Sequence, residues 1–160
     1  MSVPSTGSED KIEAFWKSSR EYIPAENRNA SFASWSFGDS AELANDLLKL
    51  VIAGAKTATC GALFDYEADN EAPPKEGSYH ILTDFEGTPH CLIQLTSVTL
   101  SNFGDVPVDF ALAEGEGSFE EWRQAHIEFF NRRAMETGNV FDGETVLVLE
   151  RFKVIYATTV

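Results

Sequence analysis

The chain has 160 residues, of which 43% are hydrophobic and 24% charged, a composition typical of an ordinary globular domain and not of a disordered segment. Its formal net charge of −14 disfavours binding to long nucleic-acid duplexes and leaves a small or single-stranded ligand as the expectation. No apolar run is long enough to cross a bilayer and no signal-peptide pattern follows Met1, so we expect a cytoplasmic protein without membrane contacts. Neither Cys60 nor Cys91 lies in a CxxC pair, which predicts free thiols and no structural metal.

The first third of the chain predicts two helices separated by a strand. Ser8, followed by two acidic residues, is typical of a helix start. Residues 31–37 alternate apolar and polar side chains, the period of a half-buried strand. Asp39 and Glu42 resemble a capping box, and the amphipathic helix that they open is expected to end at Gly54.

The middle of the chain is rich in strand-forming sequence. Residues 57–63 predict a short strand, and 65–77, acidic and containing two prolines, predict a loop. Residues 79–83 and 90–100 predict two strands joined as a hairpin.

The last third predicts a helix between two other segments. Residues 102–117 are expected to form loop and short helix. Ser118 and Glu121 form a second capping box, whose helix Gly138 should end, and 145–156 predict a final strand. Short strands with irregularly placed helices predict an α+β fold: a small, mostly antiparallel barrel with helices packed around it.

A short motif, Lys56-x-x-Thr59, lies where the second helix is expected to give way to a strand. A partly desolvated lysine there either binds an anionic group or loses its proton and acts as a base, and the threonine hydroxyl could then be activated as a nucleophile. The alternative is structural: Lys56 interacts with the last carbonyls of the helix, and Thr59 is an ordinary strand residue. In a regular strand the two side chains point to opposite faces and meet only if the junction is irregular. We also expect Lys56 to be surface-accessible, so that its replacement by alanine should leave the fold intact.

Polar and aromatic residues further along the chain also have a structural alternative. Glu116 has acidic neighbours around the start of a helix, and all of them could simply favour its dipole: Glu114, Glu116, Glu120 and Glu121. Trp122 and His126 are one helical turn apart, a spacing more typical of a core pair than of a catalytic pair.

Two aromatic residues could stack on a nucleic-acid base. Trp35 lies in the first predicted strand and Tyr66 in the acidic loop. A tryptophan in a small barrel is usually buried, so Tyr66 is the better candidate for a ligand contact.

The pattern Gly54-x-Lys56-x-x-Thr59, between an amphipathic helix and a strand, resembles the signature of ASCH domains, whose fold resembles the PUA barrel of RNA-modification proteins. Further segments are similar to the longer bacterial branch of that family: 35–40, 113–117, 122–130 and 150–152. The resemblance implies an N-terminal extension with a helix over 1–30 and an ASCH domain over 31–160. One position departs from it, because Gly61 stands where the family often has an arginine.

The resemblance implies a cleft near Lys56 that binds single-stranded RNA or a modified nucleoside, and a hydrolase activity. The first interpretation is a ribonuclease that depends on Mg²⁺ or another divalent cation. The alternatives are a metal-free amidohydrolase that deacylates N4-acetylcytidine and a binding module without catalysis. The amidohydrolase branch implies the catalytic set Lys56, Thr59 and Glu116. Ligand contacts are expected from Thr57, Tyr66, Trp35 and Arg123, and no residue is assigned as a metal ligand.

Overall fold

A computed structural model describes the chain over residues 6–158. The described residues fall into two compact units: 6–55, 77–95 and 152–158 form the first, and 56–76 and 96–151 form the second. No helix in the described part of the chain is long and apolar enough to span a membrane.

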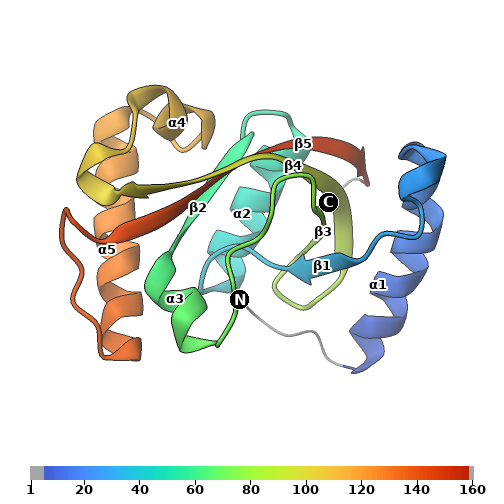
Figure 1. Cartoon of the computed structure of the whole chain (residues 1–160), viewed down its shortest axis with the longest axis horizontal. Helices are drawn as coiled ribbons and strands as arrows, with labels where there is room; N and C mark the ends of the chain where they lie inside the picture. Colours follow the sequence, from blue (N-terminus) through green and yellow to red (C-terminus); the bar gives the residue numbers. More distant parts are fainter. Residues whose placement is uncertain (1–5, 159–160) are drawn as a thin grey trace. The chain divides into compact units, whose positions relative to one another are not determined.

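Five strands form a mixed sheet in the order β1-β3-β4-β5-β2 (Figure 1). Their bounds are β1 Phe32–Trp35, β2 Ala58–Ala62, β3 Tyr79–Thr83, β4 Pro89–Asn102 and β5 Val146–Ala157. Strand β1 runs parallel to β3, whereas β3 is antiparallel to β4 and β2 is antiparallel to β5. The α+β class is therefore confirmed. The predicted barrel is not observed, because β1 and β2 are the two ends of the strand order and do not pair with each other among the described residues.

The first unit contains α1 (Thr6–Ser19), α2 (Ala41–Ile52) and two short 3-10 helices, Arg20–Tyr22 and Ala25–Asn27. Helix α1 begins at Thr6, two residues before the predicted start at Ser8. The Ser40 hydroxyl accepts a hydrogen bond from the Leu43 backbone N–H, so Ser40 caps α2 in place of the predicted Asp39. The apolar face of α1 packs in a core cluster whose buried members are Ile12, Phe15, Trp16, Ile23, Tyr79, Ile81 and Leu92.

The second unit contains α3 (Leu63–Ala68), a 3-10 helix (Phe103–Asp105), α4 (Val108–Ala113) and α5 (Phe119–Thr137). The segment predicted to be a loop from residue 65 thus begins inside α3. The capping box before α5 is confirmed, because the Ser118 hydroxyl accepts from the Glu121 N–H at 3.2 Å. Gly138 ends the helix with a φ of 73°, in the left-handed region that glycine adopts without strain.

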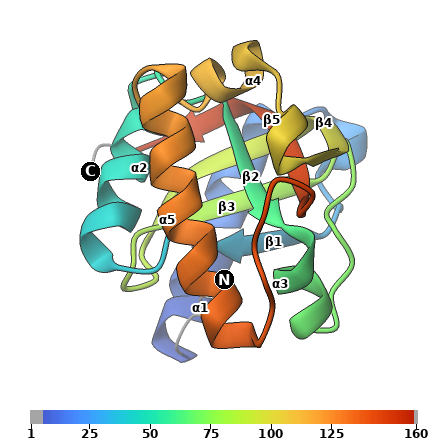
Figure 2. The same ribbon diagram turned by 90° about the vertical axis from the view of Figure 1, so that its left-hand side faces the viewer.

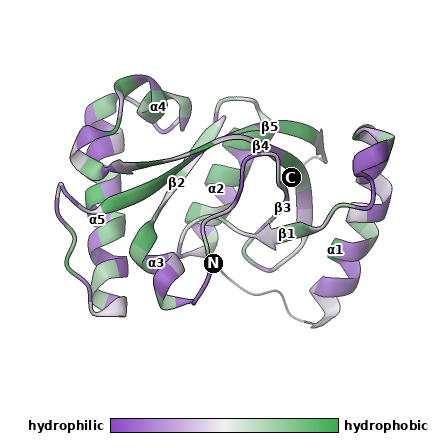
Figure 3. Ribbon diagram, in the orientation of Figure 1, coloured by the Kyte–Doolittle hydropathy of each residue, from purple (hydrophilic) through white to green (hydrophobic). Residues whose placement is uncertain are grey.

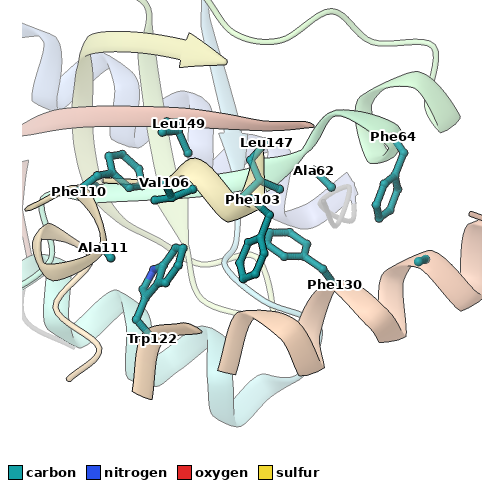
Figure 4. Packing of buried hydrophobic residues seen from close by; sticks show 12 residues of the cluster. Ala62, Phe64, Phe103, Val106, Phe110, Ala111, Trp122, Phe130, Leu147 and Leu149 are labelled. Atoms are coloured by element: carbon teal, nitrogen blue, oxygen red, sulfur yellow. The ribbon is translucent and has the colours of Figure 1, made fainter. Parts of the chain in front are cut away.

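The core of the second unit lies between α5 and the pair formed by β2 and β5 (Figures 2 and 4). Figure 3 shows why this packing forms: β5 is mostly hydrophobic, whereas α5 alternates hydrophobic and hydrophilic residues along its length. The buried cluster contains Ala58, Ala62, Phe64, Phe103, Val106, Phe110, Ala111, Trp122, Phe130, Ala134, Leu147 and Leu149. This packing places the start of β2, the end of α4 and the first turns of α5 together.

Candidate active site

Lys56 begins the second unit, two residues before β2. The backbone N–H of Thr57 donates to the Ala113 carbonyl at 2.8 Å, which fixes this junction against the end of α4. Lys56 is 1% exposed, so the expectation of a surface-accessible lysine is wrong. Burial of an ammonium group requires partners of opposite charge, and they come from the segment after α4.

Two carboxylates hold the Lys56 ammonium. Its Nζ donates to Glu114 Oε1 at 3.0 Å and to Glu116 Oε2 at 3.3 Å. Gly115, between them, has a φ of 73°, a conformation that lets both acidic side chains turn toward the lysine. Burial by itself lowers the pKa of Lys56, but the two carboxylates outweigh it and raise the pKa above the ordinary value. The lysine is therefore a fixed ammonium donor, not a base.

Glu114 is the centre of this cluster. Its Oε2 accepts from Trp122 Nε1 at 2.6 Å and from Cys60 Sγ at 3.4 Å, and lies 3.4 Å from His126 Nε2. Burial alone would raise the pKa of Glu114, but Lys56 and the hydrogen bonds from His126 and Trp122 lower it to about 2. Glu114 is thus ionised, and both of its carboxylate oxygens accept hydrogen bonds. The side chain of Glu116 is more exposed to solvent, 17% compared with 2% for Glu114.

His126 lies on α5 with both ring nitrogens engaged. Its Nδ1 is 2.7 Å from the Trp122 carbonyl, which can only accept, so Nδ1 carries a proton. Its Nε2 faces Glu114 and lies 4.0 Å from Glu116 Oε2. Burial lowers the pKa of His126, but the hydrogen bond and charge of Glu114 outweigh it and raise the pKa. The imidazole packs in the core, stacked on Trp122 at 4.4 Å between ring centroids, and its Nε2 faces the Glu114 carboxylate.

Thr59 lies on β2 opposite Glu150 of β5. Directly opposed residues of an antiparallel pair share a face of the sheet, so the two side chains lie on the face opposite to that of Cys60. Glu150 is 4% exposed, and burial followed by the charge of Glu114 raises its pKa to about 8, although Lys56 and a hydrogen bond with Tyr66 oppose the shift. Glu150 therefore carries a proton at neutral pH. The Glu150 carboxyl is therefore within range of the charges of Glu114 and Lys56.

The four residues predicted to contact a ligand differ in burial and in their position in the fold. Tyr66, on α3, is half-buried and would contact a Cβ added at Gly61, 3.6 Å from its ring, so it lies on the Thr59 face. Thr57 is exposed, with its hydroxyl 3.4 Å from the Ala113 carbonyl. Arg123 is exposed on α5. Trp35 belongs to the other unit, is 8% exposed, and donates its Nε1 to His80 Nδ1 at 2.9 Å.

Comparison with known proteins assigns the family. The ASCH domain model matches residues 33–156. This chain belongs to the ASCH domain family. It is similar to an ASCH domain structure from Lactobacillus crispatus, with 33% identity over 96% of this chain and 99% of that chain and a TM-score of 0.86. It is also similar to a protein structure from Enterococcus faecalis, with 31% identity over 91% and 88% of the two chains and a TM-score of 0.79. No curated protein sequence matches it.

Within the part of the chain that the structure describes, one group of side chains could hold a metal ion. Cys60 Sγ, a Glu114 carboxylate oxygen and a His126 ring nitrogen all lie within 4.8 Å of one another. Mg²⁺, the ion anticipated from the sequence, prefers oxygen ligands in an octahedral arrangement and retains several waters. A partly buried thiol and an imidazole do not provide such a set. The donors suit a softer cation better than Mg²⁺.

Sequence reasoning missed two residues that the fold of this ASCH domain brings to the site. Glu114 was assigned only to the start of the next helix, although its spacing of two residues from Glu116 was a signal that both could face one partner. Glu150 interrupts the apolar run of β5, and an acidic residue inside a buried strand is uncommon unless it has a role. Lys56 and Glu116, both predicted, do meet.

Proposed function

We propose that this ASCH domain is a metal-independent amidohydrolase that removes the acyl group from a small nucleoside such as N4-acetylcytidine. The observation that carries the proposal is the charge balance at Lys56. Its ammonium donates to Glu114 Oε1 at 3.0 Å, Glu116 Oε2 at 3.3 Å and the Glu114 carbonyl at 3.4 Å, so its charge is already balanced and a substrate oxygen would have to replace one of these acceptors. Such a donor suits the carbonyl oxygen of a neutral amide better than a phosphodiester, which needs net positive charge.

The chain-wide charge supports the same preference. A net charge of −14 repels a polyanion at long range, and this repulsion is absent for an uncharged nucleoside. Membership of the ASCH family is consistent with RNA-related ligands and with hydrolysis, and does not by itself distinguish the two substrates.

In the proposed reaction the Thr59 hydroxyl attacks the acyl carbon, and the Lys56 ammonium donates to the oxyanion that forms. Glu116, the more exposed of the two carboxylates, accepts the hydroxyl proton. Glu150, opposite Thr59 and protonated at neutral pH, donates a proton to the amine that leaves. Water then hydrolyses the acyl-threonine ester, which regenerates the free enzyme.

The test is an activity screen of the purified chain against N4-acetylcytidine and single-stranded RNA, each with and without excess chelator. Deacylation that survives chelation is the expected result. RNA cleavage that disappears on chelation, without deacylation, would contradict the proposal and support a metal-dependent ribonuclease. Binding of either ligand without turnover would support a binding module.

A matched pair of variants at one position tests the nucleophile. Thr59→Ser keeps the hydroxyl and should retain deacylation, whereas Thr59→Ala should lose most of it with little change in nucleoside affinity. Equal turnover in the two variants, with both folded by circular dichroism, would remove Thr59 from the proposed mechanism.

A further inference from the structure

Three potential metal ligands of different chemistry converge on one point in the second unit. Cys60 comes from β2, Glu114 follows α4, and His126 comes from α5. Glu114 Oε2 is 3.4 Å from Cys60 Sγ and 3.4 Å from His126 Nε2. Tetrahedral ligands at the usual zinc distances of about 2.0–2.3 Å lie roughly 3.3–3.8 Å from one another. Two of the three spacings thus match those of ligands around one ion, and all three donor atoms lie within 4.8 Å of one another.

The hydrogen bonds that orient His126 and Glu114 are of the kind that commonly supports a metal site. His126 donates its Nδ1 proton to the Trp122 carbonyl at 2.7 Å, which orients Nε2 toward Glu114. A metal-binding histidine almost always has its second nitrogen engaged in this way. Lys56 holds Oε1 of Glu114 at 3.0 Å, so that Oε2 faces Cys60 and His126.

A fourth ligand is available at the exposed side of the cluster. Glu116 Oε2 lies 4.0 Å from His126 Nε2, and its side chain is 17% exposed. Of the two acidic side chains it is the more exposed to solvent, so we assign it as the fourth ligand.

The charge of the cluster is also compatible with a divalent ion. With Cys60 bound as thiolate and His126 as neutral imidazole, one divalent cation and Lys56 balance two carboxylates and one thiolate. The occupied site is then neutral, which avoids the cost of an uncompensated buried charge.

We propose that Cys60, Glu114 and His126, completed by Glu116, bind one thiophilic divalent cation of the Zn²⁺ type. The ion takes no part in the proposed hydrolysis, which needs no metal. Because Glu116 also contacts Lys56 and belongs to the proposed catalytic set, binding of the ion would oppose that hydrolysis.

The test is a titration of the purified full chain with Co²⁺, a spectroscopic substitute for Zn²⁺. The expected result is one equivalent bound, with a thiolate-to-cobalt charge-transfer band in the near ultraviolet and visible bands of a four-coordinate ion, both abolished by Zn²⁺ and unaffected by Mg²⁺. The other cysteine provides a matched control, since Cys91 belongs to the first unit. Cys60→Ser should lose the charge-transfer band and Cys91→Ser should keep it.

His126→Gln gives an independent measurement and decides the result if Cys60→Ser does not fold. It should weaken Co²⁺ binding at least tenfold. Even the loss of a residue that only supports a metal ligand typically costs about 10–100-fold in affinity, and His126 is proposed to bind the ion directly. Absence of the charge-transfer band in the folded wild-type chain would overturn the proposal. So would a band that Cys91→Ser removes and Cys60→Ser retains, or unchanged Co²⁺ affinity in His126→Gln.

Discussion

Replacement of Lys56 by methionine should destabilise the fold strongly. Methionine keeps most of the side-chain volume and removes the charge, so Glu114 and Glu116 lose the ammonium that lies 3.0 and 3.3 Å from them. At an effective dielectric constant of about 20, one such pair at 3.0 Å has a Coulomb energy of about 5 kcal/mol, part of which offsets desolvation. Removing one partner of a buried ion pair typically costs about 3–5 kcal/mol, and we expect a loss in that range.

Urea unfolding at neutral pH, followed by tryptophan fluorescence, measures this loss. Lys49→Met is the matched control: Lys49 is exposed on α2, and its replacement should change the free energy of unfolding by less than about 0.5 kcal/mol. The double variant Lys56→Met/Glu114→Gln should recover part of the loss, because it removes the carboxylate left without its ammonium partner. A loss below about 1 kcal/mol in Lys56→Met would refute the reasoning, because removal of one partner from a buried ion pair costs more than that.

Three further predictions concern Glu150, the proposed catalytic residues and a helix cap. The pKa of Glu150 rises from 4.5 to about 8 on folding, so its protonated form stabilises the fold below about pH 4.5 and this contribution is lost as the pH rises through 8. Glu150→Gln should therefore gain stability relative to wild type between pH 5 and 8, roughly, in urea unfolding; parallel stability curves would contradict this. Thr59→Ala and Glu116→Gln should each reduce the rate of deacylation about 100-fold or more. The double variant should be scarcely slower than the slower single variant, because the two residues act as one catalytic unit. If the two rate losses multiply in the double variant, the residues act separately. Ser118→Ala removes the cap of α5 and should cost about 1 kcal/mol by thermal or urea unfolding, with an unchanged midpoint as the contrary result.

The local elements were largely predictable because their signals are local. The capping box at Ser118 and the stop at Gly138 locate α5 directly, and strand periodicity locates β2, β3 and β5 to within one or two residues. The errors are also local in origin. Asp39 and Ser40 are both good capping residues, and only the Ser40 hydroxyl makes the bond. The short helix α3 lacks a side-chain cap, so nothing in its sequence distinguished it from loop.

The sequence by itself determined the α+β class, the family resemblance and the Lys56 motif, because these depend on residue type and spacing along the chain. Only the tertiary structure decided the order of the strands and the environment of Lys56. The strand order leaves the sheet open. The partners of Lys56 lie 58 and 60 residues away, and its burial depends on how α4 and β2 meet. The protonated state of Glu150 likewise arises from desolvation and the field of Glu114. Burial and charge proximity are properties of three-dimensional packing, so the pattern along the chain could identify the residues of the site but not their ionisation or their partners.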